Sequence, residues 1–199
     1  NTGQLFKIMA IVINGSGTIT GLSVGGLPDG CVDTDMLASS VTTGKVIAVK
    51  QAVKTDEASE ALAQGVIGSA ICSISHAAAS SSNKIWLYGT MSIGTSTGNQ
   101  RVGCVLYING SVSAAIGDAN GDRSRLTASP YIKDTHGLTQ ANFAYLHSSP
   151  ATSSVTYDMR PWQGDNTTRT VYINTEKDDS DDSYHQTCIS QLTLMEIAA

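Results

Sequence analysis

From Gly44 to the last residue, apolar and polar residues alternate over short stretches that turn-forming residues separate. A two-residue period is typical of strands that bury one face. Lys84–Ile93 is the clearest case, because its aliphatic residues fall on one face and Trp86 and Tyr88 fall on the other. Similar patterns predict further strands at Gly44–Val53, Val66–Ile74, Arg101–Ile108, Ser111–Ile116, Ala141–His147, Ser154–Arg160, Arg169–Asn174 and Thr187–Ile197.

These segments predict an all-β fold, a β-sandwich or a jelly roll, because turn signals recur about every ten residues. Asn109-Gly110 follows an apolar strand directly, which predicts a tight hairpin with Ser111–Ile116 as the return strand. Asp56–Gln64 has apolar residues at helical spacing. It predicts either one short helix or a loop with a strand.

The segment before Gly44 has a different character. Turn residues break residues 9–43 into short apolar pieces that cannot bury one another. We therefore divide the chain into an extended N-terminal anchoring and trimerisation segment, residues 1–43, and a jelly-roll head, residues 44–199. Three copies around an axis would cover the apolar side chains of the segment, and the predicted interface consists of Ile19, Leu22, Val24 and Leu27.

Composition narrows the function. The 199 residues have a net charge of −5, which argues against nucleic-acid binding, and no apolar run is long enough to insert into a membrane. Charged residues make up only 15% of the chain, less than the roughly 25% of a typical soluble domain. The four cysteines (Cys31, Cys72, Cys104 and Cys188) form no C-x-x-C pair, so we expect small core residues, with a disulfide as the alternative.

Several motifs carry a family resemblance. The block Gly117–Thr127 resembles the G-D-x-x-G-x-R-x-R-x-T loop of short tail-fibre-like virion proteins of marine and freshwater tailed phages. Other segments match in the same order: Gly21–Gly30, Gly44–Ile47, Leu146–Thr152, Thr156-Tyr157, Tyr172–Asn174 and Ser190–Ile197. His147 departs from the pattern, which usually has Asp after this Leu. The resemblance implies a jelly-roll head, a homotrimer and a place in the virion, with synthesis in the bacterial cytoplasm.

The sequence offers little catalytic chemistry. Asp118, Asn120 and Asp122 alternate like a calcium loop, but the following Gly and Glu positions do not fit, so a polar turn is expected. The acidic run Asp178–Asp182 is expected to be a solvated loop, with cation binding as the alternative. The four histidines lack metal spacing, and glutamates are scarce. We predict no catalytic residue, no metal and no cofactor. The alternative of another class is a jelly-roll carbohydrate-active enzyme.

Aromatic residues near predicted loops are the candidate ligand contacts. Trp162 follows Pro161 and precedes polar residues, so it is placed on a polar loop where its ring could stack on a sugar. The alternative is that Trp162 packs between subunits or over the end of a strand. Tyr131 and Tyr107 neighbour two other candidate loops, Thr127–Thr139 and Asn109-Gly110, expected at the outer end of the head.

These observations predict a non-enzymatic virion structural protein, a short trimeric fibre or adhesin that contributes to host receptor binding. Its expected partners are two further copies, other phage virion proteins and a host-surface glycan or protein. A capsid decoration or head-fibre protein that stabilises the shell is the alternative, which the short length of the chain favours.

Overall fold

The computed structural model describes residues 12–13, 19–20, 44–148, 150–178 and 180–199. The chain divides into two units, Asn1–Thr42 and Thr43–Ala199. In the first unit, β1 (Val12–Ile13) pairs antiparallel with β2 (Ile19–Thr20). Of the predicted trimer contacts, Ile19 lies in β2, whereas Leu22, Val24 and Leu27 lie outside the described residues. Trimerisation through this segment therefore stays a prediction.

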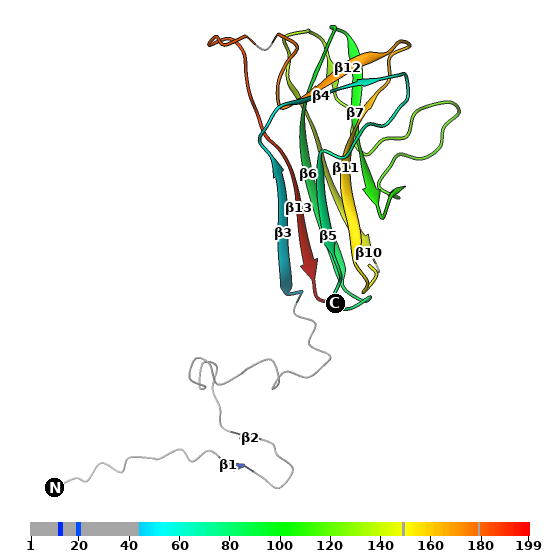
Figure 1. The fold of residues 1–199 in the computed structure, drawn as a ribbon. Coiled ribbons are helices and arrows are strands. Elements are labelled where there is room, and N and C mark those ends of the chain that lie inside the picture. Colours follow the sequence, from blue (N-terminus) through cyan, green and yellow to red (C-terminus); the bar gives the residue numbers. More distant parts are fainter. Residues whose placement is uncertain (1–11, 14–18, 21–43, 149, 179) are drawn as a thin grey trace, which may run out of the picture. The chain divides into compact units, whose positions relative to one another are not determined.

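The second unit, which we call the head, consists of strands and connecting loops (Figure 1). Its strands are β3 (Val46–Lys54), β4 (Ala58–Leu62), β5 (Cys72–His76), β6 (Lys84–Thr95), β7 (Gln100–Ile108), β8 (Ser111–Val112), β9 (Tyr131–Ile132), β10 (Thr139–Ser148), β11 (Val155–Gln163), β12 (Arg169–Ile173) and β13 (Ser190–Ile197). The described residues contain no helix long and apolar enough to cross a membrane.

The strand order is that of a jelly roll, as the sequence predicted. One sheet has the order β3-β13-β6, and β10 pairs with the other edge of β6. The second sheet has the order β5-β11-β7, and β8 and β9 pair with β7. In chain order, the eight principal strands are β3, β5, β6, β7, β9, β10, β11 and β13. When these strands are numbered from one to eight, the two sheets have the orders 1-8-3-6 and 2-7-4-5. Every pair is antiparallel, and this order is the double Greek key of viral capsid and lectin domains.

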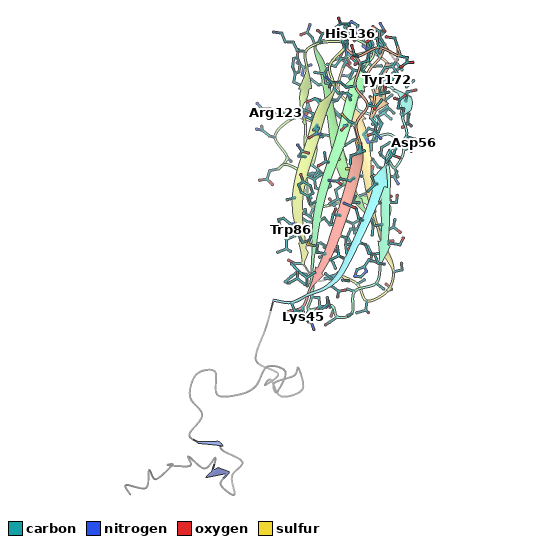
Figure 2. All side chains as sticks on the ribbon, turned by 90° about the vertical axis from the view of Figure 1, so that its left-hand side faces the viewer. Lys45, Asp56, Trp86, Arg123, His136 and Tyr172 are labelled. Atoms are coloured by element: carbon teal, nitrogen blue, oxygen red, sulfur yellow. The ribbon has the colours of Figure 1, made fainter. Side chains whose placement is uncertain are left out.

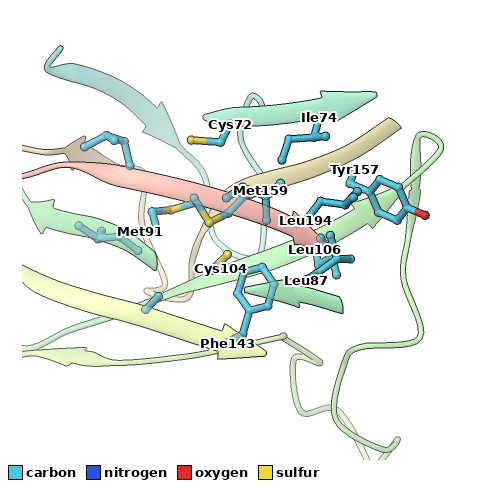
Figure 3. Packing of buried hydrophobic residues seen from close by; sticks show 14 of the residues in the cluster. Cys72, Ile74, Leu87, Met91, Cys104, Leu106, Phe143, Tyr157, Met159 and Leu194 are labelled. Atoms are coloured by element: carbon cyan, nitrogen blue, oxygen red, sulfur yellow. The ribbon is translucent and has the colours of Figure 1, made fainter. Parts of the chain in front are cut away.

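The core forms between the two sheets, and it confirms the predicted alternation. Ile85, Leu87, Met91 and Ile93 point inward from β6 and are completely buried. They meet inward residues of β7, β11 and β13, among them Leu106, Met159 and Leu194 (Figure 3). Within the described ranges, Cys72, Cys104 and Cys188 are free thiols, and the first two belong to the core. Burial raises the pKa of the Cys104 thiol far above its ordinary value, so it serves as a small apolar residue.

The hairpin at Asn109-Gly110 is confirmed. Both residues have positive φ, 53° and 78°, as a type I′ turn requires. The return strand is shorter than predicted, because β8 ends at Val112 and only Ser111 and Val112 pair with β7. The expected position of this turn at the outer end is wrong. Ile108 pairs with Tyr157 at the end of the head where β3 begins.

The structure decides one open alternative, in favour of a loop with a strand, and it corrects one predicted strand. Asp56–Gln64 contains no helix: Ala58–Leu62 forms β4, whose backbone pairs with β12. A helix of nine residues is marginal by itself, and the ladder with β12 satisfies the same backbone groups. In Val66–Ile74, only Cys72–Ile74 belongs to a strand, β5, and the preceding part makes a single bridge from Ile67 to Trp162.

Candidate functional site

Trp162 lies on strand β11, so its predicted place on a polar loop is wrong. Its neighbours Pro161 and Gln163 point into the sandwich, and Trp162 therefore points to the outer face of the β7–β11 sheet. It is nevertheless only 6% exposed, although it lies outside the core cluster. Another segment of the chain must therefore cover the indole ring, and this segment forms part of the candidate site.

Two glycines and one loop enclose the indole. Gly103 is the cross-strand partner of Trp162, and a Cβ at Gly103 would lie only 2.8 Å from Ala128 O and from Leu126 Cδ1. A Cβ at Gly164 would overlap the six-membered ring of the indole. The ring face is therefore occupied by protein, so a sugar cannot stack on it in this conformation.

A hollow of about 540 Å³ opens beside Trp162. Its polar lining comprises Arg101, Arg123, Ser124, Thr127 and Ser129, and its apolar lining comprises Leu126, Ala128 and Trp162 together with Gly117 and Gly164. Arg101 belongs to β7, whereas most of the other residues come from the block Gly117–Thr127 and the segment after it. The block that carried the family resemblance therefore builds one wall of the hollow.

Hydrogen bonds at the two ends of the block Gly117–Thr127 hold this wall in place. Arg125 Nε donates a 2.6 Å hydrogen bond to Gly117 O and closes the loop on itself. The Thr127 hydroxyl accepts a 2.9 Å hydrogen bond from Leu106 N, and Ala128 bridges to Cys104 on β7. The tip of the loop, with Arg123, extends away from the sandwich (Figure 2).

The hollow is electropositive. None of the described residues that line it is acidic, and both Arg101 and Arg123 are exposed. No ion pair of the described residues joins Arg123 or Arg125 to Asp118 or Asp122. Two guanidinium groups beside several hydroxyls can bind a ligand that carries both an anionic group and hydroxyls.

The outer face of the other sheet is built differently. Cross-strand register aligns Val49 on β3, Met195 on β13, Trp86 on β6 and Leu146 on β10 in one row, which we call the apolar ladder. Val49 is 61% exposed, and Trp86 and Leu146 are also exposed. The next row, Gln51, Thr193, Tyr88 and Ala144, is likewise uncharged. No other described segment covers this face. The sequence placed Trp86 and Tyr88 on the outer face, but it did not align them with the other strands.

The row next to the ladder points to the inner face of the same sheet and contains two titratable residues, Glu196 and His147. Glu196 accepts hydrogen bonds from Asn83 Nδ2 at 2.5 Å and from Ala79 N at 2.8 Å, and its other oxygen lies 2.8 Å from His76 Nε2. Burial alone would raise the pKa of Glu196, but these hydrogen bonds outweigh it, so the pKa lies below its ordinary value.

His147 occupies the same row on β10, where register places Glu196, Ile85 and His147 side by side. Its Nδ1 lies 3.0 Å from the hydroxyl of the buried Tyr157. Burial lowers the pKa of His147. Burial, followed by the nearby charge of Glu196, raises the pKa of Tyr157 to about 12. The residue that departs from the family pattern thus packs within a strand and forms part of no turn.

Comparison with known proteins gives a likeness of fold. No family model matches the sequence, and no curated protein matches it. A chain from the structure of infectious bursal disease virus Gx strain is similar with a TM-score of 0.38 and 14% identity, covering 76% of this chain and 37% of that chain. A chain from the Gt strain structure has a TM-score of 0.38 and 11% identity, with 86% and 44% covered. This chain therefore spans less than half the length of those chains. The jelly-roll assignment rests on its own strand order.

The structure brings together some of the predicted contact residues. Tyr131 on β9 is 56% exposed and pairs with Arg101, so it flanks the hollow that Trp162 lines. Tyr107 lies elsewhere, near the opposite end of β7, and the Arg160 guanidinium covers its ring at 4.4 Å from the centroid. Sequence reasoning missed Arg101. Its only signal was a basic residue at the start of an otherwise apolar strand.

Proposed function

We propose that this chain is a structural protein of a virus particle, a short homotrimeric fibre head that contacts the host surface. The jelly-roll strand order and the phage-like order of motifs both support this role. In this proposal, the N-terminal segment joins the trimer to other virion proteins, and the head carries the contact surface.

The observation that carries the proposal is the apolar ladder. Val49, Met195, Trp86 and Leu146 form a continuous apolar row across four strands, and a contiguous apolar surface of this kind marks an interaction site. The occupant we propose is a further copy of the same chain. Because the ladder and the row that contains Tyr88 are uncharged, two copies can meet over these two rows without bringing like charges together, whereas Lys84 lies in the row on the other side of the ladder. The number three comes from the family resemblance.

The chain enters the head at the same end as the ladder. Lys45 and Trp86 both lie toward one end of the head, and His136 lies at the other (Figure 2). Heads packed along their ladders would therefore bring their three N-terminal connections together, as a common attachment to the particle requires.

The contact with the host is placed at the hollow beside Trp162. Its arginines and hydroxyls suit a sugar that carries a carboxylate or sulfate group, with Tyr131 as the aromatic surface free to stack on the sugar ring. One such site is weak, but three sites on a trimer act together through avidity.

Three measurements test the proposal. Antibodies against the head should label intact particles, and sedimentation should give a trimer at micromolar concentration. The chain should bind acidic oligosaccharides better than neutral ones of the same length. Arg101→Ala and Arg123→Ala should each lower this affinity about tenfold, since each removes one charge-assisted hydrogen bond. Lys45→Ala, a basic residue at the far end of the head, is the matched control.

Each result discriminates between roles. A monomer in sedimentation would contradict self-association through the ladder. A trimer that decorates the shell and binds neither host cells nor sugars would favour the capsid-decoration role. Enzymatic release of sugar from the oligosaccharides would contradict the non-enzymatic role.

A further inference from the structure

Three potential metal ligands converge at the end of the head opposite Lys45. His136 belongs to the turn between β9 and β10, and Glu176 and His185 belong to the loop between β12 and β13. One ligand atom from each side chain lies within 4.8 Å of the other two. Figure 2 shows His136 at this end.

The β12–β13 loop is held firmly where it leaves the sheet. Asn174 is completely buried at φ +66°, and its backbone oxygen accepts a 2.8 Å hydrogen bond from Cys188 N. Its side-chain oxygen accepts from the Ser190 hydroxyl at 2.7 Å. Gly94 lets the backbone pass closely, because a Cβ there would lie 2.6 Å from Thr175 O. Glu176, the next residue, therefore starts from a fixed position.

Glu176 is a buried carboxylate with one unpartnered oxygen. The residue is 2% exposed, and its Oε1 accepts a 3.1 Å hydrogen bond from Gln186 N. Its Oε2 is buried without a hydrogen-bond partner among the described residues. A buried carboxylate needs a cation or further donors to compensate for the water it has lost.

The two histidines are oriented as metal ligands are. His185 Nδ1 lies 3.1 Å from Glu176 Oε1, and its Nε2 lies 3.5 Å from Asp182 Oδ2. His136 Nδ1 lies 3.2 Å from Asp178 Oδ2. His185 Nδ1, which faces Glu176, is buried without a hydrogen-bond partner among the described residues, while its Nε2 faces Asp182 and the Nδ1 of His136 faces Asp178. This carboxylate–histidine arrangement commonly supports a bound metal.

We propose that His136, Glu176 and His185 bind one divalent transition-metal ion of the zinc type. Two histidines and one glutamate form a known ligand set for zinc, with ligand bonds of about 2.0–2.2 Å. Tetrahedral ligands at these bond lengths lie about 3.4 Å apart. The three ligand atoms lie within 4.8 Å of one another, and the 55% exposed side chain of His136 has room to move closer to the other two.

The site also gives the acidic run a role. Asp178 and Asp182 orient the histidines and add negative charge around the ion, and the bound ion would join the β9–β10 turn to the β12–β13 loop. The sequence did not reveal this site, because the histidines are far apart in the chain. They become neighbours only because β10 and β12 both pair with β6.

Titration of metal-free, tag-free full-length chain with Zn²⁺ tests the proposal. Calorimetry should give one ion per chain with micromolar or tighter affinity, and Zn²⁺ should raise the melting temperature of the head. Co²⁺ in place of Zn²⁺ should produce the visible absorption of a four- or five-coordinate site. Ca²⁺ at millimolar concentration should not compete, since imidazole ligands favour zinc over calcium.

Variants assign the ligands. His136→Ala should lower Zn²⁺ affinity at least tenfold and leave the fold intact, because the side chain is largely exposed. His185→Ala and Glu176→Gln should do the same, and Asp182→Asn should weaken binding less. His147→Gln, which changes a histidine outside the cluster, is the matched control. Absence of binding at 100-fold molar excess of Zn²⁺ would overturn the proposal. So would equal binding by the His136→Ala/His185→Ala variant.

Discussion

The outer face of the β6–β13 sheet and the outer face of the β7–β11 sheet use aromatic residues in opposite ways. On the first face, Trp86 stands exposed in an uncharged row that no other described segment covers. On the second, Trp162 is buried under a loop, and two arginines surround the hollow beside it. An exposed aromatic residue in an apolar row suits a permanent protein contact, whereas a covered one supports a polar binding surface.

In the proposed function, this contrast separates assembly from recognition. A contact through the apolar ladder depends on removing apolar surface from water, so it should be indifferent to salt and to charges that lie outside the ladder. Binding in the hollow depends on guanidinium groups at an exposed surface and should respond to both. The two faces belong to different sheets, so each can be altered without changing the other.

The largest expected effect comes from a charge in the ladder. Val49→Glu places a carboxylate in the proposed interface, where it would be buried without a partner at a cost of about 3–5 kcal/mol per copy. Val49 is 61% exposed in the single chain, so the head itself should fold normally. Sedimentation should show monomers in place of trimers at micromolar concentration.

Val112→Glu is the matched control, because Val112 is a 43% exposed valine on the other sheet. It should leave the trimer intact. If both variants remain trimeric, the ladder is not the interface, and the N-terminal segment alone would hold the trimer.

Glu196 should control the acid stability of the row behind the ladder. Its pKa in the folded head is below the ordinary 4.5, so its contribution is fully present above about pH 4.5 and is lost as the pH falls through the lowered pKa. Glu196→Gln should cost about 1–3 kcal/mol of unfolding free energy at neutral pH, because it disturbs buried hydrogen bonds. It should also make the acid-induced loss of stability shallower.

Chemical denaturation between pH 3 and pH 7 measures both effects. The ladder contains no titratable residue, so acid should dissociate the trimer only where the head unfolds. Dissociation of folded heads at a higher pH would show that titratable groups outside the ladder contribute to the interface.

Salt gives a smaller but more selective contrast. Raising the NaCl concentration from about 0.1 M to about 1 M shortens the Debye length from roughly 10 Å to 3 Å. Binding of an acidic oligosaccharide to the hollow should weaken severalfold, while the trimer remains unchanged. The same titration with Arg123→Ala should show a reduced salt dependence. Equal salt dependence in the variant would place the anionic group away from Arg123.

Local patterns in the sequence were sufficient for most of the fold. Alternation along Lys84–Ile93 identified both the buried and the exposed face of β6, and Asn109-Gly110 identified the turn between β7 and β8, because each signal depends on adjacent residues. Strand β4 was ambiguous because its partner, β12, lies more than a hundred residues later. Its own short pattern does not distinguish a helix from a strand.

The candidate sites depended on distant residues and were harder to predict. Trp162 resembled a loop aromatic, because the polar residues that follow it are local and the chain that buries it is not. Gly103 leaves room for Leu126 and Ala128 beside Trp162, and neither Gly103 nor Leu126 stands out in the sequence. Likewise, the ladder exists only through the register of β3, β13, β6 and β10, which no single strand reveals.

The smallest expected effect concerns His147, which lies one residue after Leu146 of the ladder and points to the opposite side. Neutral His147 can accept a hydrogen bond at Nδ1 from the Tyr157 hydroxyl, 3.0 Å away. Burial lowers the pKa of His147 below the ordinary 6.5, so the unfolded chain takes up a proton first as the pH falls. Unfolding free energy should therefore decline as the pH falls below about 6.5 and level off below the lowered pKa.

His147→Gln should remove this slope of unfolding free energy between pH 7 and pH 5 in denaturation curves. Tyr157→Phe should keep the slope while losing the hydrogen bond. An unchanged slope in His147→Gln would assign the titration to a group other than His147. Because neither substitution alters the ladder or the hollow, trimer formation and sugar binding at neutral pH should stay as they are in the original chain.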